Sequence, residues 1–258
     1  MKGPKVLVLD IETAPLEVLA WGLFDQNIPV RRIQKDRSVL CVAAKWAHEK
    51  KVMVFSTKGQ KDVRDDRIIM SRLHVLLSQA DVVVTQNGNK FDIPIILGRF
   101  LVHGFGPPKP FKKVDTYLLA RKLGLVSNRL EYLTQVLAPE LKKSIHKKFP
   151  GDDLWIECLK GNRAAWKEME AYNARDVLGT EAVYKKLAPF GLPVNFALYH
   201  KDNKPRCSCG STNFERRGYA YTPAGKFQIH HCQDCGSWFR GTENLLSKEK
   251  KASLRRGA

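Results

Sequence analysis

The sequence predicts an α/β fold with a mixed five-stranded sheet flanked by helices, followed by a small C-terminal domain that contains two cysteine pairs. Two observations predict the sheet: three early apolar segments are joined by short links, and later apolar segments alternate with helical ones. The two closely spaced cysteine pairs indicate the second domain. We expect a large domain over 1–192, a small domain over 203–242 and a basic, disordered tail over 243–258.

The strands of the predicted sheet are short apolar runs bounded by turn residues. They are expected at 5–12, 38–46, 51–55, 81–85 and 111–115. The first run alternates like a half-buried strand, which places Asp10 and Glu12 on one face with Val6 and Val8. Two carboxylates on one face repel each other unless a positive charge lies between them. A divalent cation bound by oxygen ligands would remove this repulsion.

The helices are predicted from apolar residues that recur with the helical period. They are expected at 64–79, 91–102, 116–123, 129–137 and 162–187. In the last helix, Asp176 falls on the apolar stripe and Tyr172 lies one turn before it on the same face. Asp92 likewise lies in an otherwise apolar run, after an Asn-Gly turn signal. Because an unpaired buried carboxylate is energetically costly, either a cation lies near Asp176 or the helix assignment is wrong.

Taken in order, these stretches resemble the three motifs of the DEDD exonucleases. These are the RNase H-like, DnaQ-like proofreading nucleases, which include the exonuclease domains of family B DNA polymerases. Asp10-Ile11-Glu12 matches D-x-E, Asn87 through Asp92 matches N-x-x-x-F-D, and Tyr172 through Asp176 matches Y-x-x-x-D. The tyrosine, in place of a histidine, is typical of the DEDDy subgroup. The resemblance covers about residues 4–190.

The resemblance implies an RNase H-like fold and a phosphodiesterase that uses two Mg²⁺ or Mn²⁺ ions. In that scheme Asp10 would bridge both ions, Glu12 and Asp176 would complete the first site, and Asp92 would hold the second. Tyr172 would orient the attacking water, and nucleoside monophosphates would leave from a 3′ end. The candidate substrate-binding residues are Thr13, Asn87 and Phe91.

Each motif also has a purely structural interpretation. A D-x-E strand end can be a solvated edge, and Asp176 can pair with a lysine in a chain this basic. Tyr172 can be a core residue with a satisfied hydroxyl, and Asn87-Gly88 can be turn chemistry. The occurrence of all three motifs in order favours the metal site.

Four cysteines near the C-terminus follow a metal-binding pattern. Cys207 and Cys209 form one pair, Cys232 and Cys235 form the other, and a glycine follows each pair. Such pairs are typical of a structural Zn²⁺ site with four thiolates, and the segment resembles a zinc ribbon. The first pair departs from the ribbon pattern, because it is C-x-C rather than C-x-x-C.

Disulfide bonds are a weaker interpretation of these cysteines than a zinc site. They would need an oxidising compartment, whereas the sequence shows no signal peptide and no apolar segment long enough to span a membrane. His230 or His231 could replace one thiolate as a ligand. Cys41 and Cys158 lie in apolar surroundings, so we expect them in the core.

The composition indicates a polyanionic partner. The chain has 258 residues, 43% of them hydrophobic, and a formal net charge of +18, which is high for an enzyme of small molecules. We expect nucleic acid as the partner, with DNA favoured over RNA, no membrane association, and a cytoplasmic location in a bacterial or phage-infected cell. A basic cluster at 142–148 could line a strand-binding groove or form a solvated loop.

The leading hypothesis is a metal-dependent 3′→5′ exonuclease, acting on single-stranded 3′ ends, with a zinc ribbon that helps to grip nucleic acid. One alternative keeps the fold but changes the substrate, to RNA trimming or to structure-selective cleavage at junctions or flaps. Another alternative is a non-catalytic module that binds nucleic acid. The complete set of four carboxylates disfavours this module, because acidic groups repel a polyanion.

Overall fold

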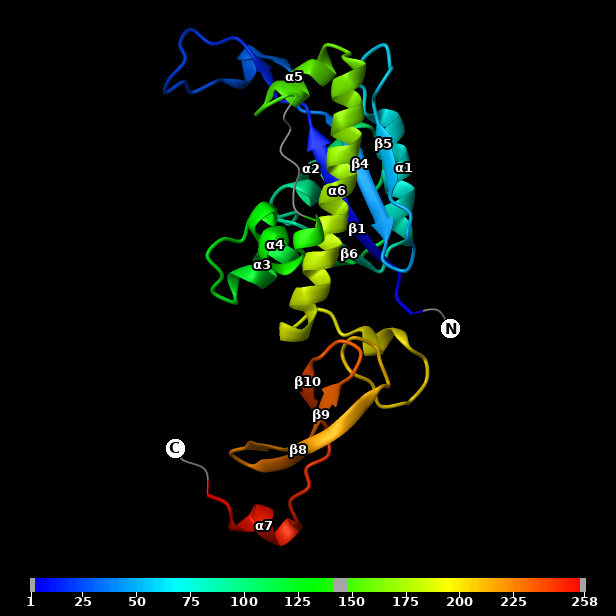
Figure 1. Cartoon of the computed structure of the whole chain (residues 1–258), viewed down its shortest axis with the longest axis vertical. Coiled ribbons are helices and arrows are strands. Elements are labelled where there is room, and N and C mark those ends of the chain that lie inside the picture. The colour runs from blue at the N-terminus through cyan, green and yellow to red at the C-terminus, as the bar shows by residue number, and fades with distance from the viewer. Residues whose placement is uncertain (1–2, 142–147, 256–258) are drawn as a thin grey trace. The chain divides into compact units, whose positions relative to one another are not determined.

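The computed structural model describes residues 3–141 and 148–255, and the chain divides into two compact units (Figure 1). The first unit comprises Lys5–Tyr184, and the second comprises Met1–Pro4 and Lys185–Ala258. This division falls inside a long helix that ends shortly before the boundary predicted at residue 192. Most of the basic cluster at 142–148 lies outside the described residues.

The first unit contains the predicted mixed five-stranded sheet, in the order β5-β4-β1-β6-β7. Its strands are β1 (Val6–Thr13), β4 (Val39–Trp46), β5 (Met53–Ser56), β6 (Val82–Thr85) and β7 (Lys112–Asp115). β4 pairs antiparallel with both β1 and β5, whereas β1, β6 and β7 run parallel. The mixed sheet predicted from the sequence is therefore confirmed.

β1 is the central strand, and this position corrects one expectation. Leu7 and Leu9 are buried as well as Val6 and Val8, so the prediction of a half-buried strand is wrong. Other elements cover both faces of the sheet, so the side chains that point to either face of β1 are apolar. Asp10, Glu12 and Thr13 are the partly exposed exceptions at the carboxyl end of the strand.

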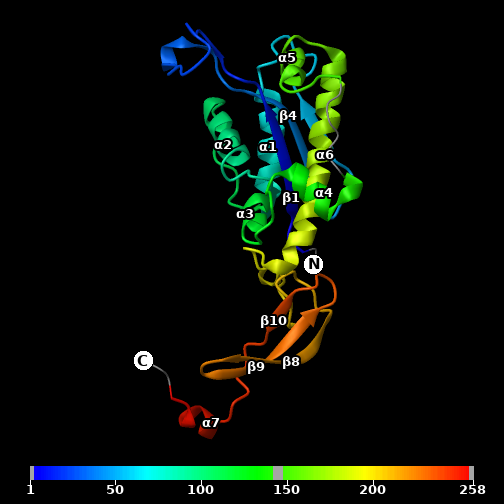
Figure 2. The ribbon, with the colours of Figure 1, turned by 60° about the vertical axis from the view of Figure 1, so that its left-hand side comes forward.

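Helices lie on both faces of the sheet (Figure 2). They are α1 (Arg67–Gln79), α2 (Asp92–Val102), α3 (Thr116–Arg121), α4 (Leu130–Leu137), α5 (Asp153–Leu159) and α6 (Arg163–Leu187). Leu7, Leu9 and Ile11 pack with α1 and α2 on one face. The opposite face packs against α5 and α6 around Leu154, Trp166 and Met169. Cys41 and Cys158 are fully buried on this second face, as predicted.

Several short elements were not predicted. β2 (Glu17–Val18) and β3 (Ile33–Lys35) form a hairpin that leads from β1 to β4, with a 3₁₀ turn, η1 (Val30–Arg32), before β3. Arg64 holds the base of this hairpin, because its guanidinium donates to the carbonyls of Pro15 and Asp36 and to Glu17. The other 3₁₀ turns are η2 (Pro139–Leu141), η3 (Ala188–Phe190) and η4 (Phe196–Tyr199).

The second unit contains a three-stranded antiparallel sheet in the order β10-β9-β8. Its strands are β8 (Phe214–Thr222), β9 (Gly225–Cys232) and β10 (Trp238–Arg240). A short helix, α7 (Lys248–Ser253), forms in the segment that was predicted to be disordered. The Ser247 side chain accepts a hydrogen bond from the Lys250 amide and so caps its N-terminus. No helix within the described part of the chain is long and apolar enough to cross a membrane.

Candidate active site

Three of the predicted carboxylates converge where α6 crosses the carboxyl end of β1. One ligand atom from each of Asp10, Glu12 and Asp176 lies within 4.8 Å of the others. The β1 register places Asp10 and Glu12 on one face, and α6 packs on that face with Asp176 turned toward it. Residues far apart in sequence thus form one acidic cluster, in which like charges repel one another unless a cation is bound.

Two buried or partly buried donors orient the carboxylates of β1. The Asn173 side-chain amide donates to Asp10 Oδ2 at 2.6 Å, and the indole N–H of Trp155 donates to Glu12 Oε2 at 3.0 Å. Neither residue was predicted as a site residue. Asn173 lies inside the third motif, which is a signal that could have identified it, whereas α5, which carries Trp155, was not predicted at all. Donors of this kind fix the direction of carboxylate lone pairs.

Tyr172 lies one turn from Asp176 and is largely buried. Burial raises the pKa of its phenol well above the ordinary value, and the charges of Asp176, Glu12 and Asp10 and a hydrogen bond to Asp176 raise it further. Its ring packs edge-on against Trp155, with the ring centroids 6.2 Å apart. Tyr172 is therefore a neutral hydroxyl held beside the acidic cluster, suited to donating a hydrogen bond rather than to accepting a proton.

Asp92 begins α2 and is only 2% exposed. Its Oδ1 accepts a hydrogen bond from the Ile11 amide at 3.1 Å, between the two acidic residues of β1. Burial, which outweighs the Ile11 hydrogen bond, raises the pKa of Asp92 to about 7, and the charge of Asp115 adds to the rise. Among the described residues, the group within 4.8 Å contains Asp10, Glu12 and Asp176 but not Asp92. Asp92 thus lies beside β1, next to this group rather than within it.

The turn before Asp92 is held by Asp115, a residue that was not predicted to belong to the site. Asn87 has a positive φ of 60°, and its amide donates to Asp115 Oδ1 at 2.9 Å. The Asn89 amide donates to the other oxygen at 3.1 Å. A Cβ on Gly88 would collide with the Thr85 side chain. Asn87 and Gly88 therefore form a turn, as in the structural interpretation of this pair, and the turn leads from the end of β6 to Asp92.

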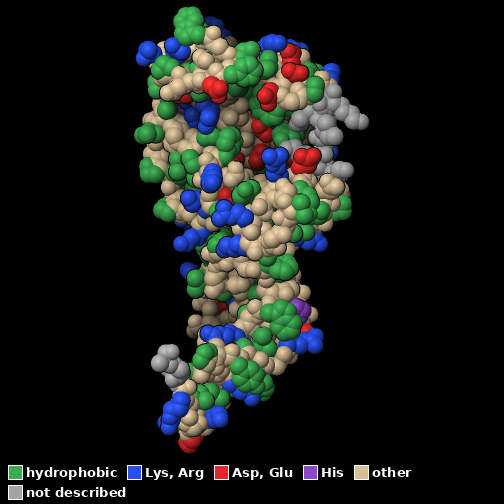
Figure 3. Space-filling model, turned by 90° about the vertical axis from the view of Figure 1, so that its left-hand side faces the viewer, with side chains coloured by type: hydrophobic (Ala, Val, Ile, Leu, Met, Phe, Trp, Pro, Cys, Tyr) green, Lys and Arg blue, Asp and Glu red, His purple; other side chains and the backbone are tan. Residues whose placement is uncertain are grey.

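The remaining candidates for substrate contact lie around these carboxylates. Phe91, immediately before Asp92, is 39% exposed. Thr13 is partly exposed and ends β1. Figure 3 shows acidic side chains in a hollow of the first unit, with Lys and Arg side chains around it. A basic surround of this kind suits a polyanionic substrate.

A model of the RNase H superfamily matches residues 33–188, which include Asp92, Tyr172 and Asp176. The chain belongs to the RNase H superfamily. Its structure is also similar to that of the family B DNA polymerase from the hyperthermophilic archaeon Pyrobaculum calidifontis, with a TM-score of 0.51 and 20% sequence identity. The similarity covers 77% of this chain and 26% of the polymerase chain, and at this identity it concerns the fold. No curated protein matches the sequence at a significant level.

Membership of the RNase H superfamily, together with the acidic cluster, supports a nuclease that acts on nucleic acid with divalent metal ions. The superfamily match begins after β1, so it does not include Asp10 and Glu12. Their assignment depends on the geometry of the site, in which they meet Asp176.

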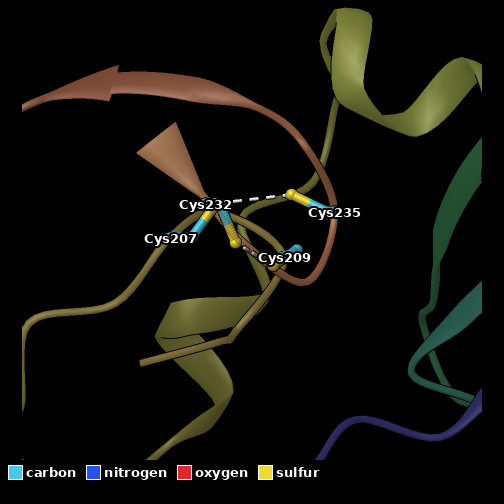
Figure 4. A group of neighbouring side chains, drawn as sticks. All are labelled: Cys207, Cys209, Cys232 and Cys235. Carbon is cyan, nitrogen blue, oxygen red and sulfur yellow. Dashed lines mark hydrogen bonds between the residues drawn. The ribbon is translucent and has the colours of Figure 1, made fainter. Parts of the chain in front are cut away.

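The second unit of this RNase H superfamily member brings the four cysteines together (Figure 4). The sulfur atoms of Cys207 and Cys235 are 3.7 Å apart, as are those of Cys209 and Cys232, and all four lie within 4.8 Å of one another. The four cysteines are not joined by disulfides, and these separations fit four thiolates around one ion. This cluster and the three-stranded sheet fit a zinc ribbon.

The turns of the cysteine cluster aim backbone N–H groups at sulfur. Burial alone would raise the pKa of the Cys232 thiol, but hydrogen bonds from the backbone N–H groups of Cys235 and Asp234 and from the thiols of Cys235 and Cys209 lower it to about 7. The two histidines considered as ligands lie outside the cluster and stack on aromatic rings instead. His230 packs against Phe239 and His231 against Trp238, with ring centroids 5.2 and 4.7 Å apart.

Proposed function

We propose that this protein is a two-metal 3′→5′ exonuclease that releases nucleoside monophosphates from DNA, with single-stranded 3′ ends favoured. The observation that carries the proposal is the convergence of Asp10, Glu12 and Asp176 within 4.8 Å, beside the neutral hydroxyl of Tyr172. The three carboxylates supply oxygen ligands for metal ions, and the Tyr172 hydroxyl lies beside them. Hydrolysis of a phosphodiester by two metal ions needs oxygen ligands of this kind.

The donor set fits Mg²⁺ or Mn²⁺. Both are hard cations that prefer carboxylate oxygens, and no cysteine or histidine belongs to the described acidic cluster. When bound, two such ions would polarise the phosphate and lower the pKa of a water molecule. Asp10 would bridge the ions, Glu12 and Asp176 would complete the first site, and Asp92 would hold the second. A cation beside Asp92 would favour its ionised form despite burial.

The other residues of the site would orient the substrate and the water. Asn173 and Trp155 hold the carboxylates of Asp10 and Glu12 in fixed directions. Tyr172 would position the attacking water through its hydroxyl oxygen, because its proton is donated to Asp176 and a phenol with a raised pKa is a poor base at neutral pH. Exposed Phe91, next to Asp92, would pack against the terminal base.

The test is hydrolysis of 5′-labelled single-stranded DNA, duplex DNA and a matched RNA, with Mg²⁺ or Mn²⁺. We expect a ladder that shortens from the 3′ end of single-stranded DNA, and its loss in Asp10→Ala. Glu49→Ala, which removes an exposed carboxylate from the turn after β4, is the matched control and should digest DNA normally. An internal cut would instead favour a structure-selective nuclease, and binding without cleavage would favour the non-catalytic module.

We also propose that the four cysteines hold one structural Zn²⁺. Four converging sulfurs suit a tetrahedral thiolate site, which stabilises a small sheet that has little apolar core of its own.

A further inference from the structure

One face of the β8–β9 hairpin in the second unit carries Arg216, Tyr219, Tyr221 and Lys226. Arg216 pairs with His230 and Tyr219 pairs with Gln228. His230 and Gln228 are two residues apart on β9, so their partners lie on the same face. Arg216 and Tyr219 are three residues apart because the strand contains an irregularity at Gly218, whose φ is 99°. This bulge brings both side chains onto the same face as Tyr221 and Lys226.

The two tyrosines on this face are exposed at the hairpin end. Tyr219 is 49% exposed and Tyr221 is 72% exposed. Phe214, His230 and Phe239, in contrast, pack against one another with centroids 5.1 to 5.2 Å apart and form the small core of the sheet. The exposed tyrosine rings therefore contribute little to that core.

Cations accompany the exposed tyrosines. Lys226 Nζ lies 3.9 Å from the ring centroid of Tyr219 and 6.0 Å from that of Tyr221. Arg216 lies on the same face, nearer the start of β8 and away from the hairpin end. Within the three described strands the one acidic residue is Glu215, which pairs with His231 on the opposite face and bridges to Arg217 at 2.6 Å. Over the second unit, Figure 3 shows hydrophobic side chains interspersed with Lys and Arg.

We propose that Tyr219, Tyr221 and Lys226 form a platform that binds unpaired nucleotides, distinct from the carboxylate site. Exposed aromatic rings stack on bases without selecting their sequence, and a neighbouring ammonium group neutralises the phosphate. Paired bases already stack on one another, so the platform favours single-stranded over duplex nucleic acid. The inference rests on the proposed function only in taking nucleic acid as the substrate.

The test measures binding rather than cleavage, with the full chain and no added Mg²⁺ or Mn²⁺. Anisotropy of a labelled oligothymidylate gives Kd for the wild type and for Tyr219→Ala/Tyr221→Ala. Because stacking contributes about 1–3 kcal/mol per base, the double variant should bind about 5- to 150-fold more weakly for each base that stacks on the two rings. Tyr219→Phe/Tyr221→Phe keeps the rings and should bind normally. Lys226→Ala should weaken binding and lower the slope of log K against log salt by about 1.

Two controls identify the face and the nucleotides that it binds. Trp238→Ala removes an exposed aromatic ring from the opposite face and should leave binding unchanged. A duplex of the same length should show no effect of the double alanine change. Unchanged binding of the oligothymidylate by the double variant, an equal loss with Trp238→Ala or an equal loss on the duplex would each overturn the platform. Since no cleavage is needed, a protein that fails to hydrolyse DNA still gives a decisive result.

Discussion

Trp155 provides a prediction that separates metal binding from packing. Its indole N–H donates to Glu12 Oε2 at 3.0 Å, and its ring packs edge-on against Tyr172. Trp155→Phe removes the donor and keeps an aromatic ring at this position. A hydrogen bond to a charged group contributes about 1.5–3 kcal/mol, and loss of a partner behind a metal ligand weakens metal binding by about 10- to 100-fold. We expect a weakening in this range for Mn²⁺.

The assay is a calorimetric titration of Mn²⁺ into each protein, followed by the Mg²⁺ dependence of DNA hydrolysis. The weakened variant should recover most of its activity when Mg²⁺ is raised, because the carboxylate itself is still present.

Trp166→Phe is the matched control for Trp155→Phe. Trp166 is buried on α6, and its indole nitrogen has no hydrogen-bond partner among the described residues. This change should lower stability through lost packing and leave the Mn²⁺ affinity unchanged. The reasoning is refuted if Trp155→Phe binds Mn²⁺ as tightly as the wild type, or if both changes weaken Mn²⁺ equally.

The other predictions concern the remaining ligands, the hydroxyl and one buried ion pair. Asp92→Asn keeps an acceptor for the Ile11 amide but removes the charge, so Mn²⁺ stoichiometry should fall from two to one; a stoichiometry of two would contradict the second site. Tyr172→Phe should lower kcat about tenfold, the effect of one lost hydrogen bond, with unchanged DNA affinity; an unchanged kcat would leave Tyr172 a packing residue. Cys232→Ser should lose the Zn²⁺ measured by mass spectrometry, and full retention would exclude the thiolate site. Lys45→Met should destabilise the fold by about 3–5 kcal/mol in urea, because it removes the ammonium group that lies 2.7 Å from the buried Glu181 carboxylate. Adding Glu181→Leu should restore much of this loss, and no restoration would mean that the lost stability has a different cause.

The fold was predictable where one periodicity ran through a whole element. α6 was found in this way, because apolar residues recur along it at the helical spacing, whereas the strands of the sheet were found as short apolar runs bounded by turn residues. α5 has only seven residues, too few to show a clear period. β2 and β3 are shorter still and depend on contacts with Arg64 from another part of the chain. The burial of β1 on both faces also depends on the helices that cover the sheet.

The carboxylates of the candidate site were more predictable than the residues that hydrogen-bond to them. Asp10, Glu12 and Asp176 were found because a carboxylate at a core-facing position conflicts with its local pattern, and the structure brings these three together. Asn173 and Trp155 conflict with no pattern, since an amide or an indole is common in a helix. Their roles follow only from the packing of α5 and α6 against β1.

The most direct test of the two-metal site is anomalous diffraction from crystals soaked in Mn²⁺ and a nucleoside monophosphate. We predict two Mn²⁺ peaks about 4 Å apart, one among Asp10, Glu12 and Asp176 and the other between Asp10 and Asp92. The absence of any peak at these carboxylates, in crystals that bind the nucleotide, would contradict the assignment of the active site.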